Sequence, residues 1–157
     1  MFFDTGDLKY EDVRLMLHLT CDSDPSRNHL PVYYFRICGA DGRTAGWCDF
    51  RVGHSDYTYY AGNIGYQVEE AFRGHHYAGK AIIILLELAR KHGFSHLYVS
   101  CATDNIASRK SCEYAGGSLA EIVKPPKGLG LDEEREICVY DFDVNCQPFR
   151  GSERLYQ

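Results

Sequence analysis

The chain has 157 residues, 45% of them hydrophobic and 25% charged, and carries a net charge of −5. Length and composition predict one globular domain (1–157, core about 13–144, tail 145–157), and the negative charge argues against nucleic acid as a partner. Seven cysteines without a C-x-x-C pair favour free thiols in the cytoplasm and give no metal-ligand cluster. No apolar run reaches membrane-spanning length, so we expect neither a membrane nor a metal as partner.

The order of the predicted elements indicates an α+β fold. The acidic and polar residues 1–12 predict an arm or a short helix-like start. Alternating apolar residues predict strands at 13–20, 31–38, 43–52, 63–70, 95–102, 118–123 and 135–144. Runs of helix formers predict helices at 78–92 and 105–115, the second with Asp104 as its N-cap. Together they predict a mixed, mostly antiparallel sheet with flanking helices.

A short basic loop links the strand at 63–70 to the helix at 78–92. Its backbone N–H groups, the unpaired first amides of the helix and the helix dipole together favour an anion. A phosphate or pyrophosphate is therefore expected here. The candidate ligands are Arg73, Gly74, His75, His76, Tyr77, Ala78, Gly79 and Lys80. The magnesium-binding P-loop pattern is excluded because Ala81 replaces the required Ser or Thr.

The loop resembles the pyrophosphate loop of the GNAT acyltransferase superfamily, [Arg/Gln]-x-x-Gly-x-[Gly/Ala]. Arg73 and Ala78 fit this pattern, and His76 stands where the family has glycine. The segment 104–117 resembles the family's later signature, Asn-x-x-Ser-x-x-x-x-Glu-x-x-Gly, beginning at Asn105. The pair of motifs is most similar to the branch of ribosomal-protein N-terminal acetyltransferases. An ordinary strand–helix turn of another α/β protein is the alternative.

The resemblance implies a GNAT fold and acetyl-CoA as co-substrate, with direct transfer of the acetyl group to a primary amine. In the family, a bulge in the strand at 63–70 pairs with the pantetheine arm, which makes Val68 the candidate main-chain ligand and oxyanion donor. Asn105 and Ser108 match cofactor-side positions, although ordinary helix capping would also explain them. Cys112 occupies the place of a family tyrosine and is the candidate general acid, with a buried structural thiol as the alternative.

Glu69 is the candidate general base, acting through water, and Asp49 is its rival; a solvated carboxylate at a strand end is the alternative for Glu69. Relatives usually carry two helices between the first two strands, and the segment from Thr20 to Pro31 is too short for them.

The acceptor side is therefore expected to be open, or completed by residues 1–12, by the loop 53–62 or by a second subunit in a homodimer. Tyr57, Tyr59 and Asp49 are the candidate acceptor ligands, through cation–π contacts and counter-charge. The tyrosines could instead pack on the sheet. The acceptor is expected to be a protein N-terminus or a small-molecule amine. The competing interpretation of the whole chain is a non-catalytic acyl-CoA-binding module.

Overall fold

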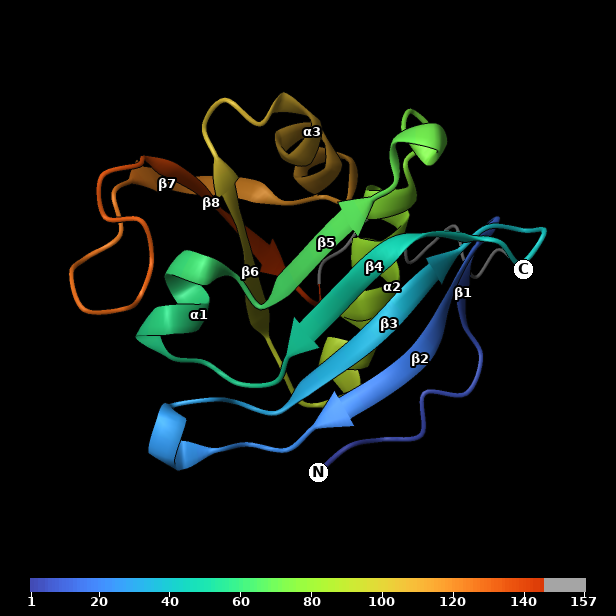
Figure 1. Cartoon of the computed structure of the whole chain (residues 1–157), viewed down its shortest axis with the longest axis horizontal. Coiled ribbons are helices and arrows are strands. Elements are labelled where there is room, and N and C mark those ends of the chain that lie inside the picture. The colour runs from blue at the N-terminus through green and yellow to red at the C-terminus, as the bar shows by residue number, and fades with distance from the viewer. Residues whose placement is uncertain (146–157) are drawn as a thin grey trace.

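The computed structural model describes residues 1–145 and contains two antiparallel sheets packed with three helices (Figure 1). The strands are β1 (Leu8–Tyr10), β2 (Val13–Cys21), β3 (Val32–Cys38), β4 (Thr44–Arg51), β5 (Ile64–Val68), β6 (His96–Ala102), β7 (Ser118–Val123) and β8 (Ile137–Asp143). The helices are α1 (Asp56–Ala61), α2 (Tyr77–Lys91) and α3 (Ile106–Tyr114), with 3-10 turns η1 (Pro25–Arg27) and η2 (Glu70–Phe72).

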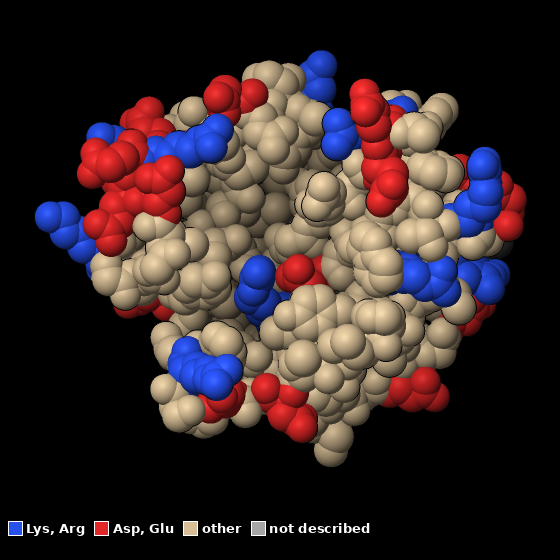
Figure 2. Space-filling model, viewed as in Figure 1, with Lys and Arg blue, Asp and Glu red and all other residues tan. Residues whose placement is uncertain are grey.

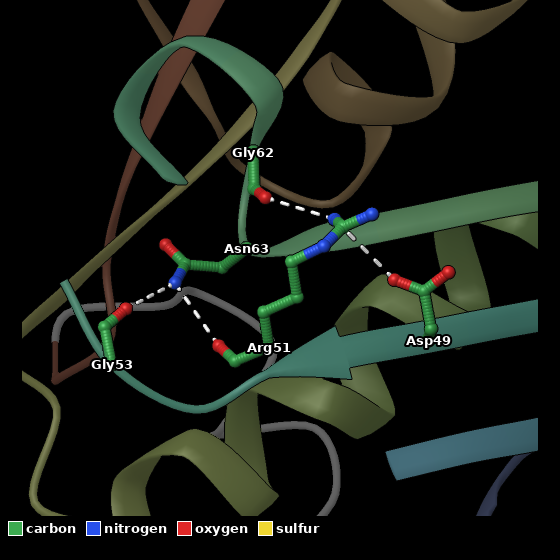
Figure 3. Close-up of polar contacts among 5 residues, drawn as sticks. All are labelled: Asp49, Arg51, Gly53, Gly62 and Asn63. Atoms are coloured by element: carbon green, nitrogen blue, oxygen red, sulfur yellow. Dashed lines mark hydrogen bonds and ion pairs between the residues drawn. The ribbon is translucent and has the colours of Figure 1, made fainter. Parts of the chain in front are cut away.

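The two sheets meet at one buried asparagine. The strand orders are β1-β2-β3-β4-β5 and β6-β8-β7. Asn63, just before β5, is fully buried; its backbone N–H donates to the carbonyl of Tyr98 on β6 (2.7 Å), and its Oδ1 accepts from the Tyr98 N–H (3.0 Å). Its Nδ2 donates to the carbonyls of Arg51 and Gly53 (Figure 3). Beyond this junction β5 and β6 diverge, so a V-shaped gap opens toward α3 (Figure 1).

Helix α2 packs on one face of the five-stranded sheet, where its Ile and Leu side chains are buried against Phe35, Phe50 and Ile64. We call the opposite face of this sheet the outer face. Within residues 1–145, no helix covers β2 to β5 on the outer face (Figure 1), because the connection between β2 and β3 contains only the three-residue turn η1. The prediction that the usual helix pair is absent is thereby confirmed.

Several local predictions are wrong in detail. The segment 53–62, predicted as a loop, contains α1, which begins with a capping box: Ser55 Oγ accepts from the Thr58 N–H, and Thr58 Oγ1 accepts from the Ser55 N–H. Residues 1–12 include the short strand β1. The N-cap of α3 is Asn105 rather than Asp104.

The predicted tail 145–157 lies outside the described residues, except for Asn145. Within residues 1–145 the six cysteines are free thiols, four of them buried. In the same part of the chain, no three His, Cys, Asp or Glu side chains gather as a metal site. None of the helices among these residues has the length and apolarity needed to cross a membrane.

Candidate functional site

A cavity of about 550 Å³ lies where β5, the start of α2 and α3 face one another. Its volume is in the range of small-molecule sites. It brings the two sequence motifs together, although they are some thirty residues apart in the chain. Of the predicted residues, those that line it are Val68, Arg73, Gly74, His76, Tyr77, Ala78, Asn105 and Ser108; Tyr66, Gln67, Phe72, Ala107, Lys110 and Ser111 complete the lining.

The loop before α2 contains positive φ angles, which residues with a side chain rarely adopt. Gly74 has φ +90°, and His76, the N-cap of α2, has φ 63° and ψ 25°, a left-handed backbone conformation at the position where the family has glycine. The His76 ring stacks on Tyr114, with 4.3 Å between centroids and 7° between planes. The Lys80 N–H makes the first helical bond, to the His76 carbonyl (2.9 Å). The N–H groups just before it have no acceptor inside the helix and suit an anion.

Three predicted phosphate ligands do not line this cavity. Lys80 is largely buried, and its Nζ pairs with Asp12 (2.7 Å) and Glu11 (3.1 Å), so its charge is neutralised by the N-terminal segment. The side chain of His75 lines a separate hollow together with Asp12. At Gly79 an added Cβ would lie 2.5 Å from the Tyr114 ring, so this glycine permits the close approach of α2 to α3.

The expected bulge in β5 is absent: β5 pairs with β4 in continuous register from Ile64 to Val68. The Glu69 N–H donates to the Ala45 carbonyl on β4 (2.8 Å). Because antiparallel hydrogen bonding alternates along a strand, the backbone groups of Tyr66 and Val68 point away from β4 and into the gap. The divergence of β5 from β6 thus exposes main-chain groups without any bulge.

One of these groups already has a side-chain partner. Arg73 Nε donates to the Val68 carbonyl at 3.0 Å, across the mouth of the gap. This bond confirms that the Val68 carbonyl faces away from β4. It also fixes the guanidinium of Arg73 beside the loop that precedes α2.

A hydroxyl pair lies on the inner side of the gap. Tyr66 Oη lies 2.6 Å from Ser108 Oγ, and burial raises the pKa of Tyr66 far above its ordinary value. Asn105 Oδ1 accepts from the Ser108 N–H (3.1 Å), so Asn105 does cap α3 while it lines the cavity. The sequence did not identify Tyr66 as a site residue, because the strand pattern in which it lies does not show that its hydroxyl reaches α3.

The structure speaks against Cys112 as the general acid. Its thiol is fully buried beneath Tyr66, with Sγ 3.7 Å from Tyr66 Oη, and it is not part of the cavity lining. Burial raises the pKa of Cys112 to about 12, which makes it a poor proton donor. Cys112 therefore supports the hydroxyl pair rather than meeting a ligand.

Asp49 lies on the outer face of β4, directly opposite Gly65 of β5. Because Gly65 has no side chain, the Asp49 carboxylate lies over β5; a Cβ built on Gly65 would be 3.2 and 3.3 Å from its two oxygens. Arg51 Nη1 lies 3.4 Å from Asp49 Oδ1 and donates to the Gly62 carbonyl (Figure 3). Burial raises the pKa of Asp49, although Arg51 opposes the shift.

Among residues 1–145, no donor forms a hydrogen bond with the buried Asp49 Oδ1, which is held by the longer ion pair with Arg51. Glu69, in contrast, is exposed at the other end of β5, next to η2 and the loop before α2. If the loop binds phosphates, Glu69 lies at the phosphate end of the gap and is misplaced as a base. Asp49, which lies opposite Gly65, the residue before Tyr66, is the better candidate for the base.

The two predicted tyrosine ligands have different surroundings. Tyr57 packs its ring under the guanidinium of Arg51, 6.0 Å from ring centroid to Cζ, and so remains near Asp49. Tyr59 Oη donates to Glu121 (2.6 Å), a bond that raises the pKa of Tyr59 to about 12, and its ring packs on Tyr98. Tyr59 therefore joins α1 to the smaller sheet, and its hydroxyl is engaged by Glu121 rather than free for an acceptor.

The comparisons with known proteins agree with this arrangement. Residues 7–118, more than half of the chain, match the family model described as an acetyltransferase (GNAT) domain. The chain belongs to this family. The predicted family, fold and class of reaction, acetyl transfer from acetyl-CoA to an amine, are therefore confirmed. No curated protein matches the chain.

Solved structures share the fold at low sequence identity. The ribosomal L7/L12 α-N-protein acetyltransferase RimL, in complex with coenzyme A, is 15% identical over 89% of this chain and 99% of its own, with a TM-score of 0.64. The microcin C7 self-immunity acetyltransferase MccE, in complex with acetyl-CoA and AMP, is 21% identical over 71% of this chain and 61% of its own, with a TM-score of 0.57. Spermidine N-acetyltransferase from Vibrio cholerae, in complex with CoA and spermine, is 11% identical over 73% of this chain and 66% of its own, with a TM-score of 0.56.

Proposed function

We propose that this chain transfers the acetyl group of acetyl-CoA directly to the primary amine of a protein N-terminus or a small molecule. The observation that carries the proposal is the cavity lined by β5, the loop before α2 and α3, where the two sequence motifs come together. The free thiols of the described residues suit the reducing cytoplasm, where we place the enzyme.

The loop residues Arg73, Gly74 and His76, together with the first amides of α2, would hold the pyrophosphate of acetyl-CoA. Aligned N–H groups and the helix dipole favour a doubly negative group there. Lys80 has no part in this because Asp12 and Glu11 neutralise it. The main-chain groups of Val68 and Tyr66 would meet the extended arm of acetyl-CoA in the gap.

The chemistry divides between the two sides of the gap. On the outer side, Asp49 would accept the proton that an ammonium must lose before its nitrogen attacks the thioester carbonyl. A main-chain N–H of Tyr66 or Val68 would donate to the oxyanion that forms. On the inner side, the Ser108 hydroxyl would donate a hydrogen bond to the departing thiolate, with Tyr66 positioning that hydroxyl. The second proton, lost from the nitrogen as the intermediate collapses, would pass to the thiolate and give the free thiol.

Calorimetric titration with acetyl-CoA tests the loop. Gly74→Val should weaken binding at least tenfold, because a β-branched side chain is strained at φ +90° and distorts the loop. Gly128→Val is the matched control: Gly128 has φ +91°, lies outside the cavity and likewise has nothing within 4 Å of a built Cβ. Equal affinity in wild type and Gly74→Val would contradict the assignment. Arg73→Ala should weaken binding less, and more so at low salt.

A further inference from the structure

The outer face carries two rows of side chains that run across the strands. One row is Leu19–Tyr34–Asp49–Gly65, and the next is Met16–Arg36–Trp47–Gln67, each formed by directly opposed residues on β2, β3, β4 and β5. A bulge at His18 in β2 brings Leu19 onto the outer face opposite Tyr34. The large apolar members, Leu19, Tyr34, Met16 and Trp47, are 37–42% exposed.

This surface is continuous with the proposed reaction centre. Asp49 stands in the first row, with Tyr34 on one side and Gly65, at the edge of the gap, on the other. Figure 2 shows the same face of the molecule: most charged groups gather at its margins, and near its middle basic and acidic groups adjoin beside a hollow. A chain of contacts therefore runs from the gap, past one carboxylate, onto an apolar surface.

We infer that this surface binds the first residues of a polypeptide acceptor: the α-amine at Asp49, and apolar side chains of the next two residues on Tyr34, Leu19 and Trp47. The inference rests on the proposed function and narrows its acceptor. Burying these half-exposed side chains would favour binding through the hydrophobic effect. Asp49 supplies a carboxylate for the ammonium, which would share it with Arg51.

The row from Asp49 to Leu19 is about as long as three residues of an extended peptide. Neighbouring strands lie about 4.8 Å apart, so the row from Asp49 to Leu19 spans roughly 10 Å. An extended peptide rises about 3.3 Å per residue, so its first three residues cover that distance. The row thus matches the amino terminus of a chain that crosses the strands.

Two other acceptor classes fit this surface less well. A small molecule is usually enclosed over most of its surface, whereas no helix in the described part of the chain covers this face. A polyamine needs a second acidic group, but Asp49 is the one acidic residue in the two rows, and Arg36 would repel a second ammonium.

The test compares acceptors that share their first residue. Full-length protein and acetyl-CoA are incubated with a peptide beginning Ser-Leu-Phe, a peptide beginning Ser-Gly-Ser, phenethylamine and spermidine, and the release of free thiol is measured. We expect kcat/KM for Ser-Leu-Phe to exceed that for Ser-Gly-Ser by at least tenfold. A higher kcat/KM for either small amine would overturn the inference and leave the proposed function intact; no thiol release with any acceptor would contradict the proposed function itself.

Variants of the surface make the test specific. Leu19→Ala and Tyr34→Ala should each raise KM for the Ser-Leu-Phe peptide roughly five- to tenfold, without changing kcat or the affinity for acetyl-CoA. Leu119→Ala, which truncates a similarly exposed leucine on β7, is the matched control. If Leu19→Ala instead converts a dimer into a monomer in sedimentation without raising KM, the face is an interface between copies and the inference is wrong.

Discussion

Replacing Gly65 by alanine should displace the proposed base without touching it chemically. The new Cβ would lie 3.2 and 3.3 Å from the oxygens of Asp49, so the carboxylate must move by about 0.2–0.4 Å to regain ordinary contact. A misplacement of about 1 Å in an active site can cost on the order of 100-fold in rate. We therefore expect kcat to fall roughly three- to sixfold, with the affinity for acetyl-CoA unchanged.

The assay is thiol release at saturating acetyl-CoA, with thermal unfolding as a check on the fold. Because alanine is less flexible than glycine in a strand, the variant should unfold at the same or a higher temperature. The control is a double-mutant cycle: in an Asp49→Asn background, the Gly65→Ala change should have no further effect on kcat. An equal loss in both backgrounds, or no loss in the single variant, would refute the position of Asp49 at the reaction centre.

Three further variants test separate parts of the site. Asp49→Asn should lower kcat by about 10²–10⁴. Burial raises the pKa of Asp49 in the folded state, so the ionised carboxylate destabilises the fold once the pH exceeds that pKa. The variant should therefore unfold at a higher temperature than wild type at pH ~7, but not in acid. A lower unfolding temperature at neutral pH would contradict this. Tyr66→Phe should lower kcat while the dissociation constant of acetyl-CoA stays the same, since it removes only the partner of Ser108. His76→Gly should keep or improve acetyl-CoA affinity in calorimetry, because glycine accepts φ 63° without strain; a large loss would mean that the imidazole itself binds phosphate.

The local patterns of the chain predicted most of its fold. Strand alternation and the helix formers from Ala78 to His92 placed the main elements within a few residues, since burial of one face dictates those periods. Helix α1 was missed because its cap pairs Ser55 with Thr58, not with the Glu or Gln that usually marks a capping box.

The candidate site was harder to predict because its chemistry depends on contacts across strands. Lys80 lies in a basic loop by sequence, yet Glu11 and Asp12 from the other end of the domain neutralise it. Asp49 and Gly65 are sixteen residues apart, and only the pairing of β4 with β5 shows that the glycine leaves room for the carboxylate. Periodicity alone carries no information on such pairs.

The measurement that tests the central claim most directly is the fate of the thioester. Purified protein, acetyl-CoA and the Ser-Leu-Phe peptide are incubated, free thiol is followed over time, and the peptide is sequenced by mass spectrometry. The proposed function predicts that thiol release is matched by an acetyl group on the peptide's α-amine, and that both are lost together in Asp49→Asn. Tight binding of acetyl-CoA with no release of thiol, for this peptide and for a panel of other amines, would contradict it and identify the chain as a non-catalytic acyl-CoA-binding module.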